Sequence, residues 1–90
     1  MKISEAKKEK ISEQILGLLY SSFPKPMFTS QIAKEIARDE EFIKNLLNVL
    51  RKKNLVNDVK KNNKGISYLR RIRWKLGDEV YKAYKDFQKF

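Results

Sequence analysis

Apolar residues between positions 32 and 56 follow two helical patterns that lie back to back. In the longer pattern, Ile43, Leu46, Leu47 and Leu50 recur at the spacing of an amphipathic helix, and Phe42 and Val49 widen its apolar face. The shorter pattern is a stripe made of Ile32, Ala33, Ile36 and Ala37. A short helix, a tight turn and a longer helix form a helix-turn-helix, although an ordinary pair of core helices has the same spacing.

Polar residues mark the expected ends of these two helices. Asp39 is a good N-cap for the longer helix, because its carboxylate can accept hydrogen bonds from the free N–H groups of the first turn. Two glutamates follow in that turn, where acidic side chains suit the helix dipole. Asn54 stands where the helix should end in a left-handed residue. Thr29 or Ser30 is the expected cap of the shorter helix.

Helices are also predicted at both ends of the chain. The first covers residues 1–20, has Ser4 as N-cap, and buries a stripe of Ile11, Ile15, Leu18 and Leu19. The last covers residues 77–90, with Asp78 and Glu79 in its first turn. Its apolar stripe is Val80, Ala83, Tyr84 and Phe87, with Tyr81 and Phe90 beside it. Residues 21–26 contain both prolines and form a loop, and residues 27–28 are a short extended link.

The region after the helix-turn-helix predicts a β-hairpin. Residues 56–60 can form a strand, and residues 62–65 have the composition of a turn. Residues 66–75 alternate between two sides of a second strand: Ile66, Tyr68, Arg70, Ile72, Trp74 and Leu76 on one, Ser67, Leu69, Arg71, Arg73 and Lys75 on the other. The first side is mostly apolar, so we expect Ile72 and Trp74 to pack on the helices.

These elements predict one domain of residues 1–90, mainly α with a small β-hairpin (α+β). The expected order is helix, short strand, helix, helix, two-stranded wing, helix. A chain of this length can bury one modest core.

The composition excludes several classes of function. The chain has no cysteine and no histidine, so the usual nucleophile–base pairs and most zinc sites cannot be built. We therefore expect neither an enzyme nor a bound cofactor or metal. No apolar run approaches the ~20 residues of a membrane span, and the N-terminus does not resemble a signal peptide. A cytoplasmic protein without a membrane partner is the expectation.

The net charge of +10 is concentrated in one block of the chain. Residues 51–75 hold ten basic residues and a single acidic one, whereas residues 1–50 hold eight and seven and residues 76–90 hold three of each. The lysine-rich surface of a heat-adapted protein would explain the high lysine and glutamate content, but not this segregation. A local basic field is what a surface that binds a polyanion requires.

Two segments resemble the MarR and ArsR families of transcriptional regulators. The first segment follows the family pattern in IAKEI, a cap residue and FIKNLLNVLRKKNLV, with Asn54 in place of the usual glycine. The second segment, WKLGDEVYKAY, resembles the family's closing strand and the start of its last helix. The resemblance covers about residues 11–84 and implies a winged helix-turn-helix. Winged helices also serve in protein contacts within transcription, replication and chromosome complexes.

The resemblance also implies where DNA would be contacted. The third helix would enter the major groove with an outward arc of Glu41, Lys44, Asn45, Asn48, Arg51 and Lys52. The wing would follow the backbone or the minor groove through Lys60, Lys61, Asn62, Asn63 and Lys64, with Arg71 and Arg73 on its flank. Ser30 and Gln31 could donate to a phosphate. Glu40 and Glu41 depart from this picture, because they place negative charge where phosphates would approach.

Together these features predict a double-stranded DNA-binding protein that acts as a small transcriptional regulator. The alternative is a winged-helix module that docks on another protein or a nucleoprotein complex. Nothing in the chain indicates an effector ligand. We expect a homodimer whose interface is formed by Val80, Tyr81, Tyr84, Phe87 and Phe90, because a monomer would leave some of these side chains exposed. The alternative is that these aromatic residues fold back onto the first helix of the same chain.

Overall fold

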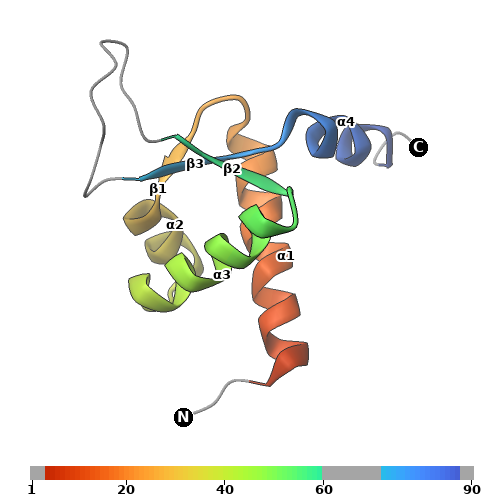
Figure 1. Ribbon diagram of the computed structural model, residues 1–90. Helices are drawn as coiled ribbons and strands as arrows, with labels where there is room; N and C mark the ends of the chain where they lie inside the picture. Colours follow the sequence, from red (N-terminus) through yellow and green to blue (C-terminus); the bar gives the residue numbers. More distant parts are fainter. Residues whose placement is uncertain (1–3, 60–71, 88–90) are drawn as a thin grey trace.

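The computed structural model describes residues 4–59 and 72–87 of the chain. Its elements are, in order, α1 (Glu5–Ser22), β1 (Met27–Phe28), α2 (Thr29–Ile36), α3 (Glu40–Lys52), β2 (Val56–Val59), β3 (Arg73–Leu76) and α4 (Asp78–Phe87). Three helices gather below one small sheet, and α4 extends sideways from the end of β3 (Figure 1). The predicted fold class and order of elements are confirmed. No helix in these residues combines the length and the apolar character that a bilayer span requires.

Local hydrogen bonds define the ends of α1 and α3. The Ser4 hydroxyl accepts from the backbone N–H of Lys7 at 3.2 Å, and α1 runs to Ser22, two residues beyond the predicted end. The Asp39 carboxylate accepts from the N–H of Phe42 at 3.1 Å, as predicted. Asn54 has φ of 63°, which is the predicted left-handed stop after α3. These ends depend on neighbouring residues only, which explains why the sequence indicated them.

The start of α2 differs from the prediction. Neither Thr29 nor Ser30 is the cap; Phe28 occupies that position, and its N–H donates to the Gln31 side-chain carbonyl at 2.9 Å. Thr29 is instead a buried residue whose hydroxyl accepts from the Trp74 indole N–H at 2.8 Å. A hydroxyl engaged in the protein interior is not available to the free N–H groups of the first turn of α2.

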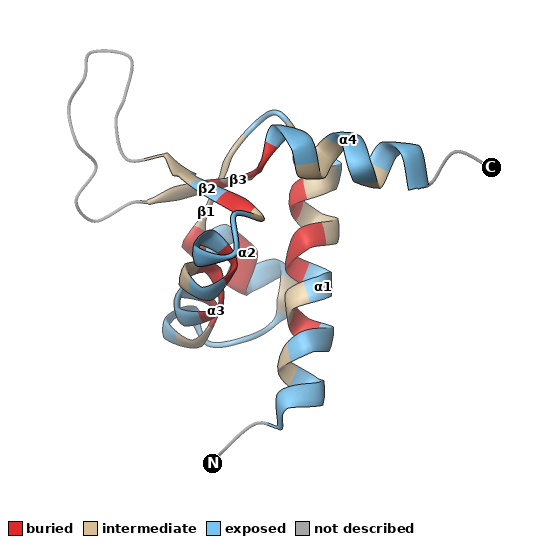
Figure 2. Cartoon of the chain, turned by 45° about the vertical axis from the view of Figure 1, so that its right-hand side comes forward, coloured by how far each residue is buried: buried red, intermediate tan, exposed pale blue. Residues whose placement is uncertain are grey.

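The core lies where α1, α2 and α3 meet the sheet, and Figure 2 shows the buried residues on the facing sides of these elements. The side chains with no more than 1% exposure are Ile15, Leu19, Ile32, Ile43, Leu47, Val56, Trp74 and Leu76. The predicted apolar stripe of α3 is confirmed, because all four of its residues are buried. Val49 is an exception to the widened face, since 46% of it is exposed.

The sheet has three antiparallel strands in the order β1-β3-β2, one more than the predicted wing. β1 joins it because Met27 pairs with Trp74. On the other side of β3, Val56 pairs with Leu76 and Asp58 with Trp74. The predicted alternation is confirmed in β3, where Trp74 and Leu76 are buried, but Arg73 and Lys75 are half-buried instead of fully facing solvent.

Aromatic contacts attach α4 to α1. The rings of Tyr20 and Tyr81 are 5.2 Å apart, those of Phe23 and Tyr81 are 4.0 Å apart, and those of Tyr20 and Tyr84 are 5.7 Å apart. No residue of α4 is buried. Tyr81 and Tyr84, two of the residues predicted to form the dimer interface, therefore pack on α1 of the same chain. This is the arrangement given above as the alternative to a dimer interface.

The remaining predicted dimer residues differ in placement. Val80 is half-buried against the core, whereas Phe87 is 75% exposed. Ala83, predicted to lie in the same apolar stripe, is exposed. Phe90 lies outside the described residues.

Candidate nucleic-acid interface

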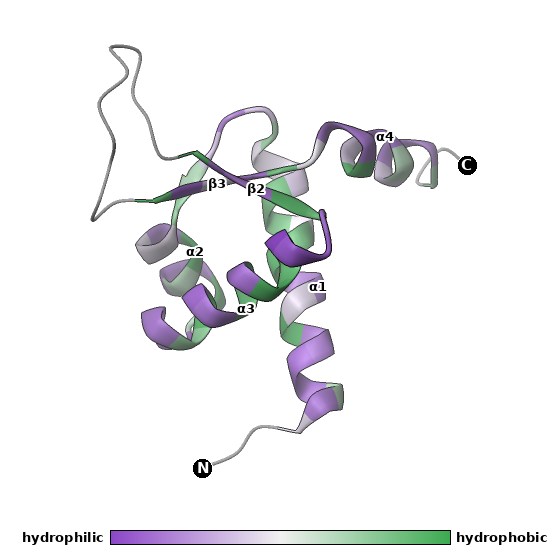
Figure 3. Cartoon of the chain, viewed as in Figure 1, coloured by the Kyte–Doolittle hydropathy of each residue, from purple (hydrophilic) through white to green (hydrophobic). Residues whose placement is uncertain are grey.

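The position of α3 is determined by its packing on α2. Ile32 of α2 and Ile43 and Leu47 of α3 are fully buried in one core. Between the helices, Ala37 takes a left-handed conformation with φ of 60°, and its N–H donates to the carbonyl of Lys34. The side of α3 opposite this core is mostly exposed, and it is hydrophilic (Figure 3). The helix-turn-helix prediction is confirmed as a structure.

All six residues predicted for the outward arc of α3 lie away from its buried stripe. Five of them are exposed and Asn48 is half-buried; the exposed ones are Glu41, Lys44, Asn45, Arg51 and Lys52. Asn45 also borders a groove between α3 and α1. The arc therefore offers amide and cationic donors on one surface, which suits the acceptor groups of base edges and phosphates.

Charge changes sign along α3. Glu40 and Glu41 occupy the first turn, and Arg51 and Lys52 occupy the last. Both pairs complement the helix dipole, because acidic groups are favoured at the N-terminus and cations at the C-terminus. A polyanion that approaches this face is attracted by the C-terminal half of α3 and repelled by its first turn.

The first turn of α2 carries the two residues predicted to contact a phosphate. Ser30 and Gln31 are both exposed. The Gln31 carbonyl oxygen is engaged by the Phe28 N–H, which holds the side chain against the helix end and leaves its amide NH₂ as the donor. The geometry is compatible with a phosphate contact at this turn.

The base of the wing is described, but its tip is not. β2 ends at Val59 and β3 begins at Arg73, and these two residues are paired with each other. The predicted wing residues Lys60, Lys61, Asn62, Asn63, Lys64 and Arg71 lie outside the described residues. Arg73 is half-buried, with its guanidinium carbon 5.9 Å from the centre of the Phe28 ring. Its predicted role on the wing flank stays a prediction.

One contact that positions the interface was not predicted. The Thr29 hydroxyl, which accepts from Trp74, also donates to the carbonyl of Ile72 at 3.4 Å, and the Thr29 N–H reaches the same carbonyl at 3.4 Å. These bonds join the start of α2 to the wing strand β3. The available signal was the indole N–H of a tryptophan expected to be buried, since such a group needs an acceptor.

The side chains at this surface can make polar and charged contacts with a ligand. These side chains are amides, ammonium and guanidinium groups and carboxylates, and the chain has neither histidine nor cysteine. Within residues 4–59 and 72–87, no group of three or more acidic side chains is arranged to hold a metal ion. The arrangement can form hydrogen bonds and ion pairs with a polyanion.

Comparisons with known proteins give the same fold. No protein-family model and no curated protein sequence matches the chain. Among solved structures, the Staphylococcus aureus MepR–DNA complex superposes with a TM-score of 0.70 at 24% identity over 91% of this chain and 68% of that one. A MarR transcription factor from Planctomyces limnophilus superposes with a TM-score of 0.69 at 28% identity over 89% of this chain and 54% of that one. A mutant of ZitR from Lactococcus lactis, in apo form, gives a TM-score of 0.69 at 18% identity over 91% of this chain and 57% of that one.

The likeness covers nearly all of this chain but only part of most of these proteins. A structure of a MepR mutant from a multidrug-resistant S. aureus isolate, for example, is covered over 56% of its length, with a TM-score of 0.70 at 23% identity. The matched proteins are MarR-family regulators. The chain therefore has the winged helix-turn-helix fold of MarR-type transcriptional regulators.

Proposed function

We propose that this protein binds double-stranded DNA and regulates transcription. The observation that carries the proposal is the exposed polar arc of α3, a helix that packs on α2. The strands at the base of the wing follow α3 in the chain and belong to its most basic block, residues 51–75. The structural neighbours are transcription factors, and one of them, MepR, was solved in complex with DNA. A shared fold alone does not determine a function, so the proposal rests on the side chains of this surface.

In this proposal α3 enters the major groove. Lys44, Asn45 and Asn48 meet base edges, where asparagine suits adenine and lysine suits the acceptors of guanine. Arg51 and Lys52 contact the backbone beside them, and Ser30 and Gln31 donate to a phosphate from the first turn of α2. The wing lysines and Asn62 and Asn63 add backbone or minor-groove contacts.

The acidic first turn of α3 restricts how the helix can lie. Glu40 and Glu41 are both exposed, so phosphates cannot approach that end without repulsion. An insertion centred on Asn48 keeps the basic last turn near the backbone. Glu41 can then face the groove floor, where it can accept from the amino group of cytosine.

The proposed regulator is a homodimer. Phe87, 75% exposed on a helix with no buried residue, and the half-buried Val80 and Tyr84 are available for a contact between copies. A two-fold axis through α4 would place two copies of α3 about one DNA turn apart, roughly 34–36 Å, on a palindromic site.

Selection of binding sites from random duplex DNA, followed by titration of the selected duplex at several salt concentrations, tests this function. We expect enrichment of a palindromic sequence and an affinity that falls with salt by a slope of about −0.9 per neutralised phosphate. Absence of both enrichment and salt-dependent duplex binding would refute the proposal. It would leave the protein-interaction module as the function of the fold.

A further inference from the structure

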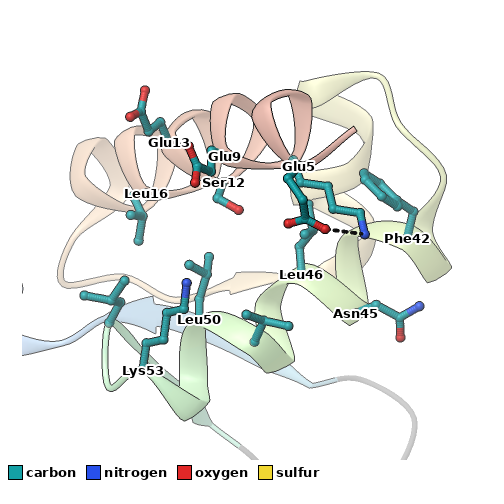
Figure 4. Close-up of a pocket in the computed structure, with 13 residues that line it drawn as sticks. Glu5, Glu9, Ser12, Glu13, Leu16, Phe42, Asn45, Leu46, Leu50 and Lys53 are labelled. Atoms are coloured by element: carbon teal, nitrogen blue, oxygen red, sulfur yellow. Dashed lines mark ion pairs between the residues drawn. The ribbon is translucent and has the colours of Figure 1, made fainter. Parts of the chain in front are cut away.

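A groove with a volume of about 690 Å³ separates the first half of α1 from one side of α3. Ser12 points into it from α1, and Leu16 and Leu50 point toward each other across its floor (Figure 4). Its residues recur every three or four positions along both helices: Glu5, Lys8, Glu9, Ser12, Glu13 and Leu16 on α1, and Phe42, Asn45, Leu46, Val49 and Leu50 on α3, continued by Lys53 at the C-cap and by Leu55. The groove thus follows one ridge of each helix, which is the surface a third helix packs on.

The two walls of the groove differ in chemistry. The α3 wall is mostly apolar, with Asn45 and Lys53 as its polar members. Part of its apolar surface is open to solvent, because Val49 is 46% exposed and Phe42 is half-buried. The exposed side of the α1 wall is polar and carries three glutamates at successive turns, Glu5, Glu9 and Glu13. An occupant that satisfies both walls needs aliphatic side chains on one side and cations on the adjacent side.

The charge of the α1 wall runs against that of the whole chain. Three of the eleven acidic residues line this groove in a protein with a net charge of +10. Glu5 forms an ion pair with Lys8 at 3.6 Å, drawn in Figure 4. In the part of the chain that the structure describes, no ion pair engages Glu9 or Glu13. These two carboxylates are therefore open to a basic partner, with Lys53 the only cation of the facing wall among the described residues.

We infer that this groove binds a basic amphipathic helix of a partner protein. The aliphatic face of the incoming helix would lie on Val49 and Phe42. Lysine or arginine side chains on the neighbouring face of that helix would reach Glu9 and Glu13. The α3 wall from Phe42 to Lys53 is about 16 Å long at 1.5 Å per residue, so it accommodates roughly three turns of the incoming helix. This is the helix-in-groove mode of recognition, with anchors at i, i+3 or i+4, and i+7.

Helix docking in this groove is independent of DNA binding. The groove lies on the α1 side of α3, and among the described residues proposed to contact DNA only Asn45 lines it. A protein that fails to bind duplex DNA can still dock a helix here, and the converse also holds. The two proposals therefore need separate measurements.

The test uses a displayed library of helix-forming peptides about four turns long. The anchor positions of the peptides are varied among aliphatic residues. The positions on both flanks of the anchors are varied among lysine, alanine and glutamate. The full chain is the bait, and Glu9→Lys with Glu13→Lys is the counter-selection bait. We expect enriched peptides to carry lysine on one flank and to lose roughly tenfold in affinity toward this double variant, since two attractive ion pairs become repulsive. Val49→Asp should weaken the same peptides.

The matched control is Glu35→Lys with Asp86→Lys, which makes the same change of charge at exposed sites outside the groove and should leave peptide affinity unchanged. Circular dichroism of each variant checks that the fold is kept. The inference is wrong if no peptide prefers the parent chain over the groove variant, or if glutamate-flanked peptides are enriched. It is also wrong if Val49→Asp converts a dimer to a monomer in light scattering, because a second copy would then fill the groove.

Discussion

The indole N–H of Trp74 donates to the hydroxyl of Thr29 at 2.8 Å, across 45 positions of sequence. Trp74 is in the middle strand of the sheet and is 1% exposed, and Thr29 is the first residue of α2. The bond ties the wing strand to the helix that supports α3. This buried polar pair is therefore one of the contacts that orient the wing strand relative to the proposed recognition helix, beside the hydrogen bonds between Thr29 and Ile72.

Thr29→Val tests this pair. Valine has the same shape but no acceptor, so the Trp74 N–H is left buried without its partner, and we expect a loss of about 1–3 kcal/mol in the free energy of unfolding. Urea denaturation measures it. Thr29→Ser keeps the hydroxyl and should lose clearly less. If Thr29→Val were as stable as the parent, the bond would not hold the wing.

Leu47→Ala tests the packing of α3. Leu47 is fully buried, and the truncation should lower stability by roughly 2–5 kcal/mol through lost burial and the cavity that remains. Thermal denaturation is the measurement. Val49→Ala on the same helix is the control, because its half-exposed side chain should change stability by only a few tenths to about 1 kcal/mol. Equal effects at both positions would mean that α3 faces the core differently.

Replacing Lys60, Lys61 and Lys64 together with alanine tests the wing. We expect weaker binding to every duplex and a slope of log affinity against log salt that is flatter by about 0.9 for each lost phosphate contact. Anisotropy titrations across salt concentrations provide both quantities. Lys7, Lys10 and Lys82, exposed on α1 and α4, form the matched triple control. An unchanged slope in the wing variant would remove these lysines from the interface.

Asn48→Ala tests base readout by α3. Loss of a bidentate amide contact should change discrimination among sequences by about 1–3 kcal/mol while non-specific affinity stays close to that of the parent. Competition between the selected duplex and single-base variants measures this. Gln14→Ala on the exposed side of α1 should leave discrimination unchanged. A uniform loss of affinity for all duplexes would assign Asn48 to the backbone instead.

Phe87→Glu tests the homodimer. Because Phe87 is 75% exposed, the substitution should leave the fold intact and shift light scattering at micromolar concentration from a dimer toward the 10.7 kDa monomer. Tyr84→Glu should in addition lower the melting temperature, since Tyr84 packs on Tyr20. A parent protein that already scatters as a 10.7 kDa particle would contradict the dimer.

The apolar spacing of the sequence predicted α3 and its buried stripe, and the caps at Ser4, Asp39 and Asn54 were predicted as well. These features depend on residues within four positions of one another, and strong local patterns survive packing unchanged. The basic character of residues 51–75 was also readable, because charge counts do not depend on the fold.

Only the tertiary structure decided how the elements select their partners. Thr29 is a plausible helix cap by local rules, yet its hydroxyl bonds Trp74, and β1 is a strand only because β3 lies beside it. Val49 continues the helical apolar pattern but is exposed, since α1 and α3 leave a groove on that side. Tyr81 and Tyr84 likewise pack on α1, a helix distant from them in sequence. Local spacing shows that a side chain is apolar, but it contains no information about which distant element the fold places beside that side chain.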